Sequence, residues 1–159
     1  MANICTVEMR VVLPLEFEED FLSLFWGYSK DKDKEKEEGK RVYFPVCFFN
    51  NCIENAKDEG TKLVDLTIFF DCKWSVYSSL VDGYPQEDDG SITLKEALKR
   101  YKIKYLYLLS EEPGIGFNER LEYQANRDDL DDFNMEDELE EREYWSNPSD
   151  EYIELDKLI

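Results

Sequence analysis

The chain has 159 residues, with 38 Asp and Glu against 19 Lys and Arg and no His, so its formal net charge is -19 at pH 7. The missing His excludes Ser-His-Asp and Cys-His nucleophile systems, His-ligated zinc and a histidine general base. The negative charge argues against direct binding to nucleic acid or to an anionic membrane, and it favours a positively charged protein as partner.

The length suits one domain with a tail, and the hydrophobic content of 42% is sufficient for a folded core. Glu8 and Arg10 interrupt the apolar N-terminal stretch. No apolar run reaches the roughly eighteen residues of a membrane span, so we expect a cytoplasmic protein without a signal peptide.

Four cysteines lie inside or beside apolar runs: Cys5, Cys47, Cys52 and Cys72. This placement predicts reduced, buried thiols more than a disulfide framework. The C-x4-C spacing of Cys47 and Cys52 has no second ligand pair nearby, which makes it a weak zinc signal.

The first predicted element is a strand over residues 4–13, which Pro14 ends. Its side chains alternate between an apolar face with Val7, Met9 and Val11 and a polar face with Thr6, Glu8 and Arg10. Residues 16–28 place Phe17, Phe21, Leu24 and Phe25 at helical spacing behind an acidic first turn. This pattern predicts a short amphipathic helix that closes near Gly27.

Residues 29–41 alternate in charge without an apolar side chain and predict an exposed charged loop. Residues 42–49 predict a second strand. Pro45 requires that this strand lies at an edge, starts after the proline or contains a bulge. Residues 50–60 predict a turn or short helix. Residues 63–74 are dominated by β-branched and aromatic side chains and predict a strand at the centre of a sheet.

After a loop, Thr93 and Glu96 form a T-x-x-E capping box, which predicts a helix to about Tyr101. Residues 103–109 and 117–123 predict two strands, and the Pro-Gly turn signal between them indicates a hairpin or a bulged connection.

The composition changes at residue 127. Residues 127–159 contain fourteen acids and three bases, a net charge of -11, interleaved with aromatic and aliphatic side chains. We therefore divide the chain into an α+β domain over residues 1–126, which includes the charged loop, and an acidic, aromatic-containing C-terminal segment over residues 127–159.

The order strand, helix, strand, strand, helix, strand matches a ferredoxin-like α+β sandwich, with two helices on one face of an antiparallel sheet. Three stretches carry a family resemblance: Met1-Ala2-Asn3 with Cys5, Phe69-Phe70-Asp71-Cys72-Lys73-Trp74-Ser75, and Ser110-Glu111-Glu112-Pro113-Gly114-Ile115-Gly116-Phe117. On these residues the chain resembles a family of phage and plasmid proteins with a ferredoxin-like domain. The proline pair expected after the Trp is absent, and the acidic tail has no counterpart. The family offers no catalytic residues to carry over.

The charge profile also resembles acidic phage-encoded inhibitors of CRISPR and restriction systems, many of which imitate the charge of DNA. Duplex DNA carries one negative charge per about 1.7 Å of axis, and a helix rises about 1.5 Å per residue, so a helix rich in acids approaches that density. The candidate residues for such a surface are Asp128, Asp129, Asp131, Asp132, Glu136, Asp137, Glu138, Glu140, Glu141 and Glu143, with the neighbouring aromatics Tyr144, Trp145 and Tyr152.

A solvated acidic tail that aids solubility is the plainer interpretation, with a prior of about one half. The aromatics favour an interface, because aromatic side chains are common in binding hot spots. The same acids offer oxygen ligands for Ca²⁺ or Mg²⁺, but they lack the glycine-bearing register of an EF-hand loop. Asp71 is the one acid whose burial would suit catalysis, and capping of a turn is the more common role for such a residue.

The sequence thus predicts a non-enzymatic protein without a cofactor or catalytic residues, an inhibitor that binds the basic nucleic-acid-binding surface of a host defence protein. One alternative is an adaptor or immunity-type module that binds through an aromatic interface. A further alternative is a metal-dependent hydrolase built on Asp and Glu alone.

Overall fold

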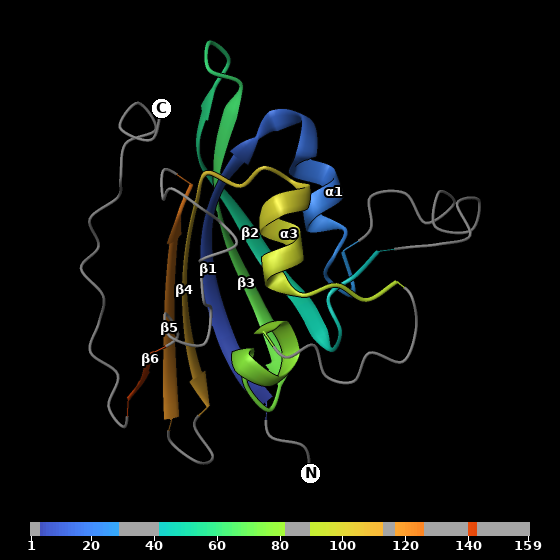
Figure 1. Cartoon of the computed structure of the whole chain (residues 1–159), viewed down its shortest axis with the longest axis vertical. Helices are drawn as coiled ribbons and strands as arrows, with labels where there is room; N and C mark the ends of the chain where they lie inside the picture. Colours follow the sequence, from blue (N-terminus) through green and yellow to red (C-terminus); the bar gives the residue numbers. More distant parts are fainter. Residues whose placement is uncertain (1–3, 29–41, 82–89, 113–116, 126–139, 143–159) are drawn as a thin grey trace.

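The computed structural model describes residues 4–28, 42–81, 90–112, 117–125 and 140–142 (Figure 1). These residues form an α+β fold. The elements are β1 (Ile4–Pro14), the 3-10 turn η1 (Leu15–Phe17), α1 (Glu18–Leu22), β2 (Cys47–Asp58), β3 (Leu63–Lys73), the π-helical turn η2 (Tyr77–Val81), α3 (Leu94–Arg100), β4 (Tyr105–Glu112), β5 (Phe117–Gln124) and the short β6 (Glu140–Arg142).

The strands make one antiparallel sheet in the order β2-β3-β1-β4-β5-β6. β1 pairs with β3 along its whole length, from Ile4 opposite Lys73 to Pro14 opposite Leu63, and with β4 on its other side. The apolar strand predicted at residues 63–74 is confirmed as β3. It lies between two neighbours, and β1 and β4 occupy the middle of the sheet.

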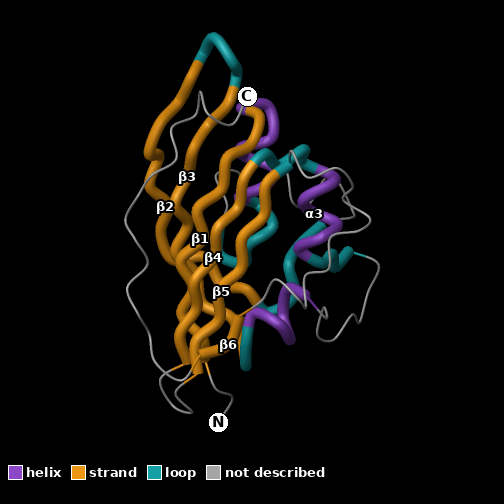
Figure 2. Tube along the Cα trace, turned by 60° about the vertical axis from the view of Figure 1, so that its left-hand side comes forward, coloured by secondary structure: helices purple, strands orange, loops and turns teal. Residues whose placement is uncertain are grey.

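All four helical elements pack on one face of the sheet, where they share a single apolar core with it (Figure 2). Aromatic rings from the helical side and from the sheet meet there. The Phe25 ring lies 4.7 Å from that of Phe70 on β3, and 5.3 Å from that of Phe44. Alternation along each strand sends every second side chain into this core.

The helix predicted over residues 16–28 is much shorter in the structure. The chain forms a 3-10 turn and then α1, which ends at Leu22, although Leu24 and Phe25 are still fully buried. The chain then leaves helical geometry, and Trp26 makes an isolated bridge to β2. Gly27 follows at φ 87°, a left-handed conformation that favours glycine. The helical spacing therefore predicted correctly which side chains are buried. It predicted incorrectly that the backbone stays helical to Gly27.

Residues 50–58 do not form the predicted turn or helix, because β2 runs from Cys47 to Asp58, and only Glu59 and Gly60 at the end of the predicted range lie in a turn. β2 starts after Pro45, lies at the edge of the sheet and has irregular register at two places. The three possibilities that Pro45 allowed, an edge position, a start after the proline and a bulge, are therefore all observed. The polar composition of the second half of β2 suits an edge strand, since charged and polar side chains protect an open edge from pairing with other chains.

The helix predicted to begin at the capping box is confirmed as α3. The Thr93 hydroxyl oxygen accepts the backbone N–H of Glu96 at 3.3 Å, which satisfies one of the free donors at the start of the helix. The predicted pair of strands that follows is confirmed as the antiparallel pair β4 and β5. The turn predicted between them, residues 113–116, lies outside the described residues.

The turn η2 was not expected from the sequence. It is held by Glu119 of β5, whose buried carboxylate accepts the backbone N–H of Val76 at 2.9 Å and of Tyr77 at 3.1 Å. The Ser110 hydroxyl of β4 donates to the same carboxylate at 2.9 Å. Glu119 therefore ties η2 to two strands of the sheet.

Candidate protein-binding face

The face of the sheet opposite the helices is called the open face. Strand register and alternation assign its side chains. They are Ile4, Thr6, Glu8, Arg10 and Val12 of β1, Phe48, Asn51, Ile53, Asn55, Ala56 and Asp58 of β2, Leu63, Asp65, Thr67, Phe69, Asp71 and Lys73 of β3, Tyr105, Tyr107, Leu109 and Glu111 of β4, and Asn118, Arg120, Glu122 and Gln124 of β5. Among the described residues no helix packs against this face.

An ion pair between Arg10 and Asp65 lies at the centre of the open face. The guanidinium donates from Nε at 3.1 Å and from Nη2 at 2.6 Å to the two carboxylate oxygens. Asn55 donates to Asp65 at 3.2 Å and to the Thr67 hydroxyl at 2.7 Å. Arg10 is 9% exposed and Asp65 only 2%, so the ion pair is buried, whereas Asn55 at the edge strand is exposed.

The network links three neighbouring strands, because Arg10 belongs to β1, Asp65 to β3 and Asn55 to β2. Arg10 was expected on the polar side of its strand, and it does lie on that face. Its burial was not expected, since it depends on an acid 55 positions away in the chain. The arrangement is structural: it fixes the register of the sheet beneath the open face.

Aromatic packing continues the network toward β4. The Arg10 guanidinium lies 5.8 Å from the centre of the Tyr105 ring, and Tyr105 packs with Val12 and Leu63. Burial, with the negative charge of Glu122, raises the pKa of Tyr105 to about 12, although Arg10 acts in the opposite direction. The phenol is therefore neutral throughout the physiological pH range.

Exposed apolar side chains lie at the β2 edge of this face and at the start of β1, whereas Val12, Leu63, Tyr105 and Leu109 of the same face are buried. Ile4 is 56% exposed, Phe48 45% and Ile53 48%. Trp26, which bridges to Phe48 at the outer edge of β2, is 45% exposed and stacks edge-on against Tyr43 with ring centres 5.5 Å apart. Large apolar side chains left in solvent around one sheet face are typical of a protein-binding surface.

The charge of the open face is negative. Outside the internally paired Arg10 and Asp65, the register assigns it two bases and five carboxylates. The bases are Lys73 and Arg120, and the carboxylates are Glu8, Asp58, Asp71, Glu111 and Glu122. Of these acids, Glu8, Glu111 and Glu122 are exposed, so they are available to a positively charged partner.

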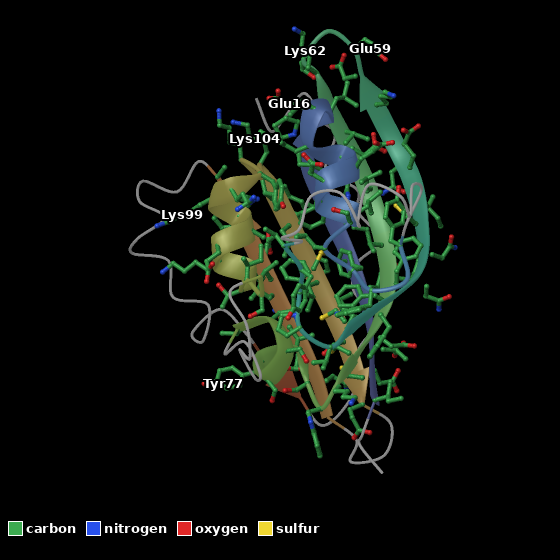
Figure 3. The ribbon with its side chains drawn as sticks, turned by 90° about the vertical axis from the view of Figure 1, so that its right-hand side faces the viewer. Glu16, Glu59, Lys62, Tyr77, Lys99 and Lys104 are labelled. Atoms are coloured by element: carbon green, nitrogen blue, oxygen red, sulfur yellow. The ribbon has the colours of Figure 1, made fainter. Side chains whose placement is uncertain are left out.

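Positive charge gathers elsewhere. Residues 95–104, in α3 and the turn after it, contain five bases and one acid. Lys99 and Lys104 project from this side of the molecule, whereas Glu59 and Lys62 lie at the tip of the β2–β3 hairpin (Figure 3). The net charge of the whole chain does not reveal this basic segment. The fold places the segment on a different side of the molecule from the open face.

Most residues predicted for the binding surface lie outside the described residues: Asp128, Asp129, Asp131, Asp132, Glu136, Asp137, Glu138, Glu143, Tyr144, Trp145 and Tyr152. The two that the structure places, Glu140 and Glu141, are in β6, which pairs with β5. At these positions the expectation of an acidic helix is wrong, because the backbone is a strand that extends the sheet.

Asp71 does not cap a turn. It lies within β3, half-buried, opposite Thr6 on one side and Phe48 on the other. Cys47 and Cys52, the weak zinc candidate, are also on one strand, but Cys47 is buried in the core and Cys52 is only half-buried. Across the described part of the chain, no three His, Cys, Asp or Glu side chains are arranged to hold a metal ion.

Comparison of the chain with protein-family models, with curated proteins and with solved structures finds no match. None of the helices between residues 4 and 142 that the structure describes has the length and apolar character needed to cross a membrane. The open face and the charge of the chain are therefore the features that bear on function.

Proposed function

We propose that this protein is a non-enzymatic inhibitor from a phage or other mobile element, which binds the basic nucleic-acid-binding surface of a host defence protein of the CRISPR or restriction type. The observation that carries the proposal is the open face, where exposed carboxylates and the exposed apolar side chains of its β2 edge accompany the buried ion pair of Arg10 and Asp65. The net charge of -19 complements a surface that has evolved to hold nucleic acid.

The strand order supports the finer description of the fold. Read from β4, the first four strands are arranged β4-β1-β3-β2, with all neighbours antiparallel and helical segments in both crossovers. This order is the one expected for the split β-α-β arrangement of a ferredoxin-like sandwich, which supports that description. Such a fold leaves one sheet face free for a partner, which is the role we assign to the open face.

The two parts of the chain divide the work of binding in this proposal. The described open face has an excess of only three negative charges, too few to imitate the charge density of DNA by itself. Residues 127–159 add a net charge of -11 and supply most of the long-range attraction. The apolar side chains of the open face then supply the short-range contact area.

The test begins with capture of bacterial proteins by the full chain at low and high salt, followed by identification of the bound protein and competition with duplex DNA. We expect one basic nucleic-acid-binding protein to bind, to be released as salt rises and to be displaced by DNA. Binding that is indifferent to both salt and DNA contradicts the mimic mechanism.

A matched pair of variants locates the surface. Glu8→Gln/Glu111→Gln removes two exposed carboxylates from the open face, and Glu16→Gln/Asp20→Asn removes two from the region of α1. The charge change is equal, so general electrostatic attraction is weakened equally. We expect the first variant to lose about tenfold more affinity than the second, consistent with two contacts of roughly 0.5–1 kcal/mol each. Equal losses would remove the open face from the proposal.

A second candidate function, an adaptor that binds through an aromatic interface, is favoured by the exposed rings of Trp26 and Phe48. In that case alanine at Phe48 and Ile53 abolishes binding, and the double glutamine variant of the open face leaves it intact. Release by salt distinguishes the two functions, because apolar contacts are strengthened or unchanged by salt.

A further inference from the structure

Three of the four cysteines lie in one row across the helix-covered face of the sheet. Cys5 of β1 is directly opposite Cys72 of β3, and Cys72 is directly opposite Cys47 of β2. All three are free thiols with no exposed surface. Residues directly opposite in antiparallel strands have Cα atoms about 4.5–5.5 Å apart, a separation that a disulfide can bridge.

The two thiols nearest the start of β1 are electronically unequal. Hydrogen bonds from Cys72 and then Ser110 lower the pKa of Cys5, although burial opposes them. The hydrogen bond to Cys5, together with burial, raises the pKa of Cys72. Burial also raises the pKa of Cys47 well above its usual range. Within this row Cys5 therefore has the most thiolate character, which is the form that reacts.

All three cysteines lie near strand ends, since Cys47 is the first residue of β2 and Cys72 the next-to-last residue of β3. Cys5 lies at the start of β1. It is the second described residue of β1, next to Ile4, which is 56% exposed. Strand ends open locally at much lower free energy than the middle of a sheet. Transient opening of the strand end at Ile4 would give a small oxidant access to Cys5.

We propose that Cys5 and Cys72 are a peroxide-sensitive thiol pair that closes to a disulfide between β1 and β3. In the first step the Cys5 thiolate attacks hydrogen peroxide: an S–O bond forms, the O–O bond breaks and hydroxide leaves. The Cys72 sulfur then attacks the Cys5 sulfenic acid, forms the S–S bond and releases the second oxygen as water. In total, two thiols and one peroxide give one disulfide and two waters, and a dithiol reductant reverses the reaction.

The experiment uses the full chain, reduced and then exposed to increasing hydrogen peroxide, with alkylation of the remaining thiols under denaturing conditions and mass spectrometry of peptides without reduction. We expect one linked peptide pair that contains Cys5 and Cys72, and its loss after treatment with dithiothreitol. The oxidised protein should melt about 5–10 °C higher, since the bond joins distant parts of the chain. A link between Cys47 and Cys72, or oxidation of Cys52 alone, overturns the proposal.

Variants of the single cysteines show which members of the row form the disulfide. Cys47→Ser should keep the cross-link and the rise in Tm, whereas Cys5→Ser and Cys72→Ser should lose both. Because a serine in the core can disturb folding, Cys5→Ala and Cys72→Ala provide a second set, and the melting of each reduced variant confirms that it is folded. Retention of a peroxide-induced rise in Tm in folded Cys5→Ala contradicts the assignment of Cys5.

Discussion

Glu119 of β5 holds the start of η2 through the backbone of Val76, whose N–H donates to Glu119 Oε1 at 2.9 Å. The carboxylate also accepts from Tyr77 and from the Ser110 hydroxyl, and its side chain is buried. A buried acceptor with three donors cannot be changed without leaving a donor unsatisfied. The segment after β3 is therefore fixed to β4 and β5 by one side chain.

Glu119→Gln is expected to destabilise the protein by about 1–3 kcal/mol, because the amide group turns one acceptor into a donor that faces the existing donors. Urea unfolding followed by circular dichroism measures the change. Glu122→Gln on the same strand is the control, since Glu122 is exposed and should change stability by less than about 0.5 kcal/mol. Equal effects of the two substitutions would show that the contacts of Glu119 contribute little.

Asp65→Ala is expected to cost about 3–5 kcal/mol, because it leaves the Arg10 guanidinium buried without its partner. The double variant Arg10→Met/Asp65→Leu should recover most of this loss, since an apolar pair of similar volume replaces the ions. A double-mutant cycle in urea supplies the coupling energy. A double variant that is as unstable as the sum of the two single variants argues against a direct interaction.

Thr93→Ala is expected to cost about 1 kcal/mol through loss of the cap of α3, because the Glu96 N–H loses its acceptor. Thr93→Ser, which keeps the hydroxyl, should remain within about 0.5 kcal/mol of the natural protein. Thermal unfolding measures both. Equal destabilisation by Ser and Ala would attribute the effect to the lost methyl group.

High pH should destabilise the fold partly through Tyr105. Its pKa is raised from 10.0 to about 12, so the folded state holds the phenol proton more tightly than the unfolded chain does. This contribution is complete below about pH 10 and is lost as the pH rises toward 12. Tyr105→Phe should therefore flatten the pH dependence of stability in this window. Titration of tyrosinate absorbance, compared between the two proteins, should show that the missing transition is the one near pH 12.

Patterns within short stretches of sequence predicted those elements whose formation depends on residues close in the chain. The capping box at Thr93 and the apolar run of β3 were both correct, since each depends on residues close in the chain. β2 was missed at residues 50–58 because its pairing comes from β3, which offers hydrogen bonds to a polar edge strand regardless of its side chains. The helix after Pro14 was overextended because burial of Leu24 and Phe25 needs no helix.

The candidate site was only partly predictable. The negative charge and the expectation of a basic partner came from composition, which needs no fold. The open face depends on which strands become neighbours, and the pairing of Arg10 with Asp65 joins positions 55 apart. Neither can be read from periodicity within a single segment. The residues chosen for the acidic tail remain a prediction, apart from Glu140 and Glu141 in β6.

The position of β1 sets an order of events during synthesis. β1 leaves the ribosome first, but its neighbours end only at Lys73 and Glu112. Until β4 has emerged, the nascent chain has a central strand with one edge unpaired and no complete core. The domain therefore cannot fold progressively from its N-terminus, and a chain cut before residue 105 should be a substrate for chaperones and proteases rather than a smaller version of this protein.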